Sequence, residues 1–221
     1  MSDTDLARAV LAALGTKLDG KAAAPATTQR KRGVFVNAIE YAIERRLLMT
    51  NPVPATKKKA GKTGKPVDKR VVANPTQARS LLAAVREQGK TGKMLEGFFG
   101  TMYYAGLRPG EAVNLRKHNV VLPPLVLNKK TGEWEEPEDA WGELVLEQSA
   151  PATGAAWTNN GRRREVRQLK GRDVGEQRPV PCPPELTKLL RLHIKNHGVD
   201  AEGRLFRGIQ NGTEVPEGTY C

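Results

Sequence analysis

The stretch YAGLRPGEAVNLR, residues 104–116, determines how the middle of the chain folds. Gly106 follows an apolar helical pattern and can take the left-handed conformation that ends a helix. Pro109 can begin the next helix, and Glu111 falls in its first turn, where a carboxylate favours the helix dipole. Arg108 is therefore predicted to stand in a tight turn between two helices. Such a fixed guanidinium suits two-point contact with a phosphate. The alternative is an arginine that pairs with Glu111 or caps carbonyl groups.

Apolar side chains at helical spacing predict further helices before this turn. The predicted helices cover residues 2–14, about 28–48, a segment that opens at Asn74-Pro75, and about 93–105. Asn51-Pro52 is expected to stop the second of them. The first two helices cannot close a core alone, so they need further helices, a partner domain or a bound ligand such as DNA.

The period of the apolar residues changes after Asn119. Residues 120–127 and 142–148 are predicted to be strands, with a polar loop at 129–139 between them. A long polar stretch follows at 149–168, in which Trp157 is the one large apolar residue. The chain then offers a short strand, QRPVPC, and a helix that Pro183-Pro184 open. The fold class expected is mixed α+β, mainly helical, with a small antiparallel sheet.

Basic residues outnumber acidic ones in the 221-residue chain, 36 against 24, which gives a formal net charge of +12. This balance favours a polyanionic partner. Residues 52–73 are rich in lysine and proline and nearly free of apolar side chains, as in an extended linker. That linker is either a solvated hinge or a strap along phosphates, where each contact would release counterions.

Several other classes of protein are disfavoured. No stretch approaches the roughly 20 apolar residues of a membrane span. Two cysteines make neither a disulfide framework nor a zinc site, and the three histidines lack metal-ligand spacing, so we expect no metal and a reducing, cytoplasmic setting. An RNA-associated protein is a weaker alternative, because RNA-recognition modules offer exposed aromatics and aromatic residues make up 5% of this chain.

Residues 105–115 resemble the first conserved box of the tyrosine recombinases, the phage-type integrases. The box reads approximately (T/A)-G-(L/M)-R-x-x-E-(L/A)-x-x-L. Its fixed positions are met by Gly106, Leu107, Arg108, Glu111 and Leu115. The resemblance implies that Arg108 contacts the scissile phosphate and that Glu111 supports the turn.

A second match lies at LKGRDVGEQRPVPCPPELTKLL, residues 169–190. The family has a lysine in a turn, then a short strand R-x-V-P-L and a helix. Arg178, Val180 and Pro181 fit this strand, Cys182 replaces the usual leucine, and Lys170 matches the lysine. The resemblance implies that Lys170 lies in the minor groove and acts as general acid to the leaving 5′ oxygen. The long arginine-rich insertion with its AAWT segment is most similar to integrases of actinobacterial mobile elements.

The domain order of the family fits the whole chain. It implies a partial helical core-binding domain at 1–51, a basic linker at 52–73, and the first part of the catalytic domain at 74–221. It also implies a double-stranded DNA partner, a tetrameric homo-oligomer on that DNA, and no cofactor. Further DNA contacts are expected from two basic groups. These are Lys57, Lys58, Lys59 and Lys62 in the linker, and Arg162, Arg163, Arg164 and Arg167 in the insertion.

Two parts of the family's machinery have no counterpart in the sequence. Neither His193 nor His197 is followed three places later by an arginine, so the His-x-x-Arg box is missing. Tyr220 lies upstream of where the family has its nucleophile. We therefore expect a chain clipped at both ends and inactive alone in site-specific recombination through a 3′-phosphotyrosyl intermediate. The alternative is a catalytically dead remnant that only binds duplex DNA.

Overall fold

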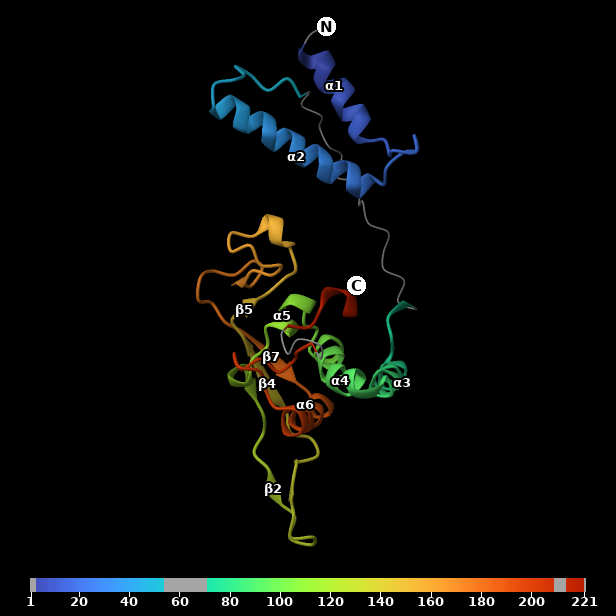
Figure 1. Ribbon diagram of the computed structural model, residues 1–221, viewed down its shortest axis with the longest axis vertical. Coiled ribbons are helices and arrows are strands. Elements are labelled where there is room, and N and C mark those ends of the chain that lie inside the picture. The colour runs from blue at the N-terminus through green and yellow to red at the C-terminus, as the bar shows by residue number, and fades with distance from the viewer. Residues whose placement is uncertain (1–2, 54–70, 209–213, 221) are drawn as a thin grey trace. The chain divides into compact units, whose positions relative to one another are not determined.

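The computed structural model describes residues 3–53, 71–208 and 214–220. The chain divides into two compact units, Met1–Val72 and Ala73–Cys221, each of which is described by itself (Figure 1).

The first unit contains two helices, α1 (Asp3–Leu14) and α2 (Pro25–Glu44). Among their described residues, Ala7 is the one buried apolar side chain, and α2 buries none. The expected end of α2 near Leu48 is wrong. Arg46 takes a left-handed φ of 59°, and the amides of Leu47 and Leu48 both donate to the Ala42 carbonyl. This closed turn ends the helix before Asn51-Pro52 is reached, and it leaves the Leu47 side chain exposed.

Four main helices build the second unit: α3 (Pro75–Arg86), α4 (Gly89–Tyr104), the short α5 (Pro109–Val113) and α6 (Pro184–His197). The predicted opening of α3 is confirmed, because the Asn74 side chain accepts from the Gln77 amide at 2.9 Å while the Gln77 side chain accepts from the Asn74 amide. Gly198 ends α6, with a φ of 65°.

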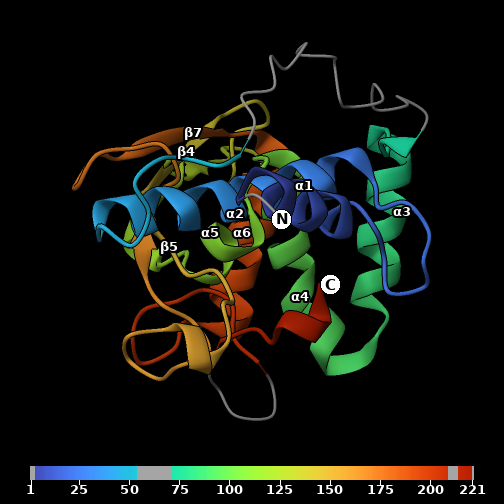
Figure 2. The same ribbon diagram turned by 90° about the horizontal axis from the view of Figure 1, so that it is seen from above.

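The central sheet is antiparallel, in the order β1 (Val120–Val121), β4 (Gly142–Leu146) and β7 (Arg178–Cys182). In Figure 2, β4 and β7 run side by side, and α6 packs against α4 (Figure 1). The core lies between these helices and the sheet, centred on Phe98, Leu144, Leu190 and Phe206. The expected mixed α+β fold with a small antiparallel sheet is confirmed.

Two expectations for the strand region are corrected. Residues 120–127 form two strands instead of one, because Pro123 and Pro124 lack the amide hydrogens that a ladder needs. The predicted loop at 129–139 contains β3 (Trp134–Glu135), which pairs with β2 (Val126–Leu127) in a hairpin that extends from the body (Figure 1). Within the polar stretch, β5 (Gln148–Ser149) pairs with β6 (Arg167–Gln168), and a 3-10 turn, η3, covers Ala155–Trp157.

Buried polar groups in this unit serve the packing. His193 is 4% exposed, and its Nε2 lies 2.8 Å from the Leu205 carbonyl, so this nitrogen donates. Burial lowers the pKa of His193, which keeps the ring neutral. Burial also raises the pKa of the Cys182 thiol to about 12, so this side chain acts as a small apolar group. No helix in the described part of the chain is long and apolar enough to cross a membrane.

Candidate nucleic-acid interface

The turn predicted around Arg108 forms as the sequence indicates. Gly106 has a φ of 61° and ends α4, and Leu107 is buried in the core. Pro109 is the first residue of α5, and Arg108 stands before it in an extended conformation. The backbone amide of Arg108 donates to Glu111 Oε2 at 2.9 Å. The turn is thus fixed on one side by an apolar anchor and on the other by a carboxylate.

Glu111 joins two arginines from separate parts of the sequence. Its carboxylate is 1% exposed. Oε1 accepts from Arg108 Nη1 at 2.9 Å, and Oε2 accepts from Arg178 Nη2 at 2.7 Å. Two guanidinium groups thus share one carboxylate, so the three side chains carry a net positive charge. The Arg108 side chain keeps 56% of its surface exposed, so pairing with Glu111 does not enclose it.

Sequence reasoning did not select Arg178 as a site residue. Its signal was present, because it is the arginine of the R-x-V-P strand. It is the first residue of β7 and follows the segment between β6 and β7 that carries Lys170. The Arg178–Glu111 contact therefore ties the end of that segment to the Arg108 turn.

Lys170 lies exposed in the segment between β6 and β7. Leu169 beside it is buried, and Gly171 after it has a φ of 75°, so the chain turns directly after the lysine. An open depression of about 820 Å³ borders this segment, lined by side chains that include Arg167, Arg172 and Gln177. The lysine therefore projects from an anchored turn beside a polar, basic hollow.

The four arginines of the insertion have different environments. Arg162 is exposed. Arg163 is 72% exposed and pairs with Glu217 at 3.1 Å, and Arg167 is 46% exposed and pairs with Glu165 at 3.4 Å. The expectation for Arg164 is corrected, because its side chain is 5% exposed and its guanidinium is fully engaged inside the protein. Arg164 is therefore not accessible for a contact with DNA.

Arg164 connects the insertion to the segment 214–220. Its Nη1 donates to the Ala150 carbonyl at 2.8 Å, and its Nη2 donates to the Val215 carbonyl at 3.0 Å and to the Tyr220 hydroxyl at 2.6 Å. Its Nε lies 3.4 Å from a Glu214 carboxylate oxygen. Tyr220 is held in turn against Phe98, with ring centroids 5.6 Å apart.

The insertion also contacts the Arg108 turn. The amide of Ala150 donates to the Gly110 carbonyl at 2.8 Å. A side chain at Gly110 would meet Ser149 Oγ at 2.8 Å and the Pro151 nitrogen at 2.9 Å. Glycine is therefore required for this close approach of two backbones. The four lysines expected to contact DNA, Lys57, Lys58, Lys59 and Lys62, lie outside the described residues.

Comparison with known proteins gives matches in structure alone. No protein-family profile and no curated protein sequence matches the chain. A structure of the Tn1549 transposon integrase with a circular intermediate DNA matches at a TM-score of 0.57 and 14% identity, over 99% of this chain and 60% of that one. The same integrase with transposon right end DNA matches at 0.55 and 16%, over 97% and 68%. The XerH site-specific recombinase bound to its difH substrate matches at 0.56 and 13%, over 99% and 50%.

This chain spans about three fifths of the length of two of the Tn1549 integrase chains that it matches. The likeness covers both units, since nearly all of the present chain is included in each alignment. At these identities the likeness concerns the backbone, which agrees with the resemblance noted in the two sequence motifs. The chain therefore has the fold of the tyrosine recombinases and integrases.

Proposed function

We propose that this chain is part of a site-specific DNA recombinase and that it binds duplex DNA through Arg108, Lys170 and the linker lysines. The observation that carries the proposal is the half-exposed side chain of Arg108, whose guanidinium is held by the buried carboxylate of Glu111. In the proposed division, residues 1–51 and 74–221 grip the duplex and residues 52–73 connect them. The DNA-bound structural neighbours support the choice of ligand.

The proposed chemistry is transfer of a phosphoryl group without a cofactor. A tyrosine that these 221 residues do not supply gives its hydroxyl proton to a base, and its oxygen forms a bond to phosphorus while the bond from phosphorus to the 5′ oxygen breaks. Arg108 stabilises the charge on the phosphoryl oxygens, and Lys170 gives its proton to the leaving 5′ oxygen. Glu111 holds Arg108 and does not exchange a proton. A second DNA end then attacks the phosphotyrosyl bond, and four copies on two duplexes are the expected assembly.

The nucleophile and the His-x-x-Arg pair have no matching residues in this sequence. We therefore expect these 221 residues to bind duplex DNA without cutting it. Incubation with a nicked duplex followed by denaturing electrophoresis tests this point. A covalent protein–DNA adduct would contradict the assignment, because it would require a nucleophile among the tyrosines present.

The binding proposal is tested by fluorescence anisotropy with a labelled duplex. Replacing Arg108 with alanine is expected to lower affinity about 10- to 100-fold, as when a charged hydrogen bond to a phosphate is removed. Arg79→Ala is the matched control, because Arg79 is an exposed arginine on α3. Equal affinities for the two variants would overturn the role of Arg108.

The strap proposal for the linker has its own measurement. Affinity is recorded over a series of salt concentrations for the unchanged chain and for a variant with Lys57, Lys58 and Lys59 all replaced by alanine. For each phosphate that the variant no longer neutralises, the slope of log affinity against log salt should fall by about 1. An unchanged slope would leave these lysines as a solvated hinge.

A further inference from the structure

The insertion between β5 and β6 forms an ordered lobe, defined here as the tryptophan lobe, residues 150–164. The β5–β6 pair closes its base. Above the base, Ala152 and Arg164 form an isolated β-bridge, and the amides of Thr153 and Gly154 both donate to the Arg163 carbonyl. A sequence stretch with one large apolar residue thus has a defined backbone.

The lobe is anchored by a buried charge. Burying a guanidinium is costly unless its donors are satisfied. Arg164 meets this condition with two carbonyls, a tyrosine hydroxyl and a nearby carboxylate. Hydrogen bonds fix the outer part as well, since the Trp157 amide donates to the Gly154 carbonyl at 3.0 Å and Thr158 Oγ1 donates to the Arg162 carbonyl at 2.6 Å.

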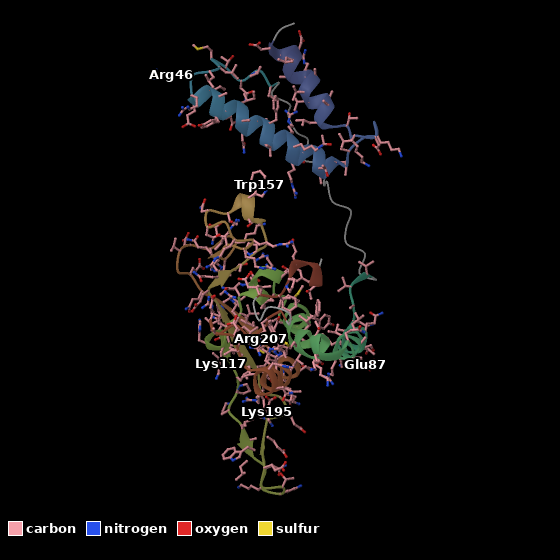
Figure 3. All side chains as sticks on the ribbon, in the orientation of Figure 1. Arg46, Glu87, Lys117, Trp157, Lys195 and Arg207 are labelled. Atoms are coloured by element: carbon pink, nitrogen blue, oxygen red, sulfur yellow. The ribbon has the colours of Figure 1, made fainter. Side chains whose placement is uncertain are left out.

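This anchored lobe exposes the large aromatic side chain of Trp157 to solvent. Trp157 is 82% exposed, more than Trp134 at 66% or Trp141 at 61%. Figure 3 shows it at the outer end of the lobe, away from the sheet of the second unit. An indole exposed to water on a hydrogen-bonded support contributes little to folding. Its position is therefore explained by a ligand better than by packing.

The charge around Trp157 identifies the class of ligand. Residues 150–172 contain six lysines or arginines and one carboxylate; Arg164 is buried, and the other five cationic side chains are exposed. Glu217 and Glu176 offset part of this charge, because they pair with Arg163 and Arg172. An acidic or nucleic-acid partner is thus favoured over a neutral protein surface. Nucleic acid also accounts for the aromatic ring, because a base can stack on an indole and an apolar side chain can enter a base step.

We propose that Trp157 is a nucleobase contact: the tryptophan lobe presses this indole against a base of the bound DNA. The proposal rests on the proposed DNA-binding function and adds a contact in which the indole stacks on a nucleobase. The lobe contacts the Arg108 turn through the Ala150–Gly110 hydrogen bond. The nucleobase that Trp157 contacts therefore lies on the same DNA as the phosphate that Arg108 holds.

Intrinsic fluorescence tests the contact in the full chain. Trp134→Phe and Trp141→Phe leave Trp157 as the one emitter among the three tryptophans. Addition of a duplex should quench its emission, and a 2-aminopurine series through the duplex should locate the step that it touches. Affinity provides the second readout. Trp157→Ala should lower affinity about 5- to 150-fold with an unchanged salt slope, because stacking is removed and no charge is.

Two variants serve as controls. Trp157→Phe should retain most of the affinity, and Trp141→Ala should bind as the unchanged chain does.

If Arg108→Ala weakens binding while Trp157→Ala does not and the emission is unaltered, the base contact is wrong and the proposed function stands. If the chain binds no duplex, the proposed function itself fails. If Trp157→Ala changes the sedimentation of the free protein and not its DNA affinity, the lobe contacts a second copy of the chain, which also overturns the base contact.

Discussion

The Arg108 turn and the tryptophan lobe both place arginine in irregular backbone, but they bury opposite members of the ion pair. In the turn the carboxylate of Glu111 is 1% exposed and the Arg108 side chain 56%. In the lobe the Arg164 side chain is 5% exposed and Glu214 is 29%. A buried anion presents its cation to the surroundings, whereas a buried cation holds segments of the protein together. The burial of the partner, and not the presence of arginine, decides between these two roles.

The largest loss of stability is expected when Glu111, the buried anion, is replaced. Glu111→Ala removes the one carboxylate shared by Arg108 and Arg178 and leaves the Arg108 amide without its acceptor. Loss of one partner from a buried pair should reduce the free energy of unfolding by about 3–5 kcal/mol. Urea denaturation measures this value. Glu165→Ala is the control, because Glu165 pairs with a half-exposed arginine. Equal small losses would mean that the turn does not depend on its carboxylate.

The second largest loss of stability is expected when Arg164, the buried cation, is replaced. Arg164→Ala leaves the carbonyls of Ala150 and Val215 without a donor, which should lower the free energy of unfolding by about 2–3 kcal/mol. Hydrogen exchange should also become faster in the tryptophan lobe and in residues 214–220. Arg163→Ala is the matched control, since its side chain is 72% exposed. Equal free energies of unfolding for Arg164→Ala and Arg163→Ala would mean that the buried and the exposed arginine contribute alike to stability.

A smaller change in stability is expected when Arg108, the exposed cation of the turn, is replaced. Arg108→Ala should lower the free energy of unfolding by at most about 1 kcal/mol, because the side chain is half exposed and Arg178 still pairs with Glu111. Thermal unfolding of the variant alongside its DNA affinity separates the two roles. A loss as large as that of Glu111→Ala would make Arg108 a structural residue.

The smallest effect is expected at Arg162. Its side chain is exposed, so Arg162→Ala should leave the free energy of unfolding within about 0.5 kcal/mol of the original. If it contacts a phosphate, the salt slope for duplex binding should fall by about 1. An unchanged slope with unchanged stability would leave Arg162 outside both roles.

Local signals were enough to predict the Arg108 turn. Gly106 and Pro109 specify how one helix ends and the next begins, and both effects act within a few residues. The overall fold followed from the same kind of pattern and from the resemblance of two motifs to the recombinases. The roles of Arg108 and Lys170 remain predictions, since they concern a ligand and not the backbone.

Long-range contacts account for what the sequence did not predict. Arg162 and Arg164 are two positions apart in a run of three arginines, yet one is exposed and the other is buried by residues 214–220. Nothing within the run distinguishes them. Arg178 acquires its partner Glu111 from 67 positions away. The end of α2 has a local cause instead: Arg46 adopts a left-handed conformation that glycine or asparagine usually takes, which the sequence does not signal.

The partners of Arg164 also set the order in which the chain can fold during synthesis. Its bonds to Val215 and Tyr220 span 51 and 56 residues. When the ribosome has made the tryptophan lobe, the carbonyl and hydroxyl that anchor it have not yet been translated. At about 5–20 residues per second, the lobe waits several seconds for them. Until then its guanidinium stays in water, so the lobe reaches its final form only after the helix α6 has been completed.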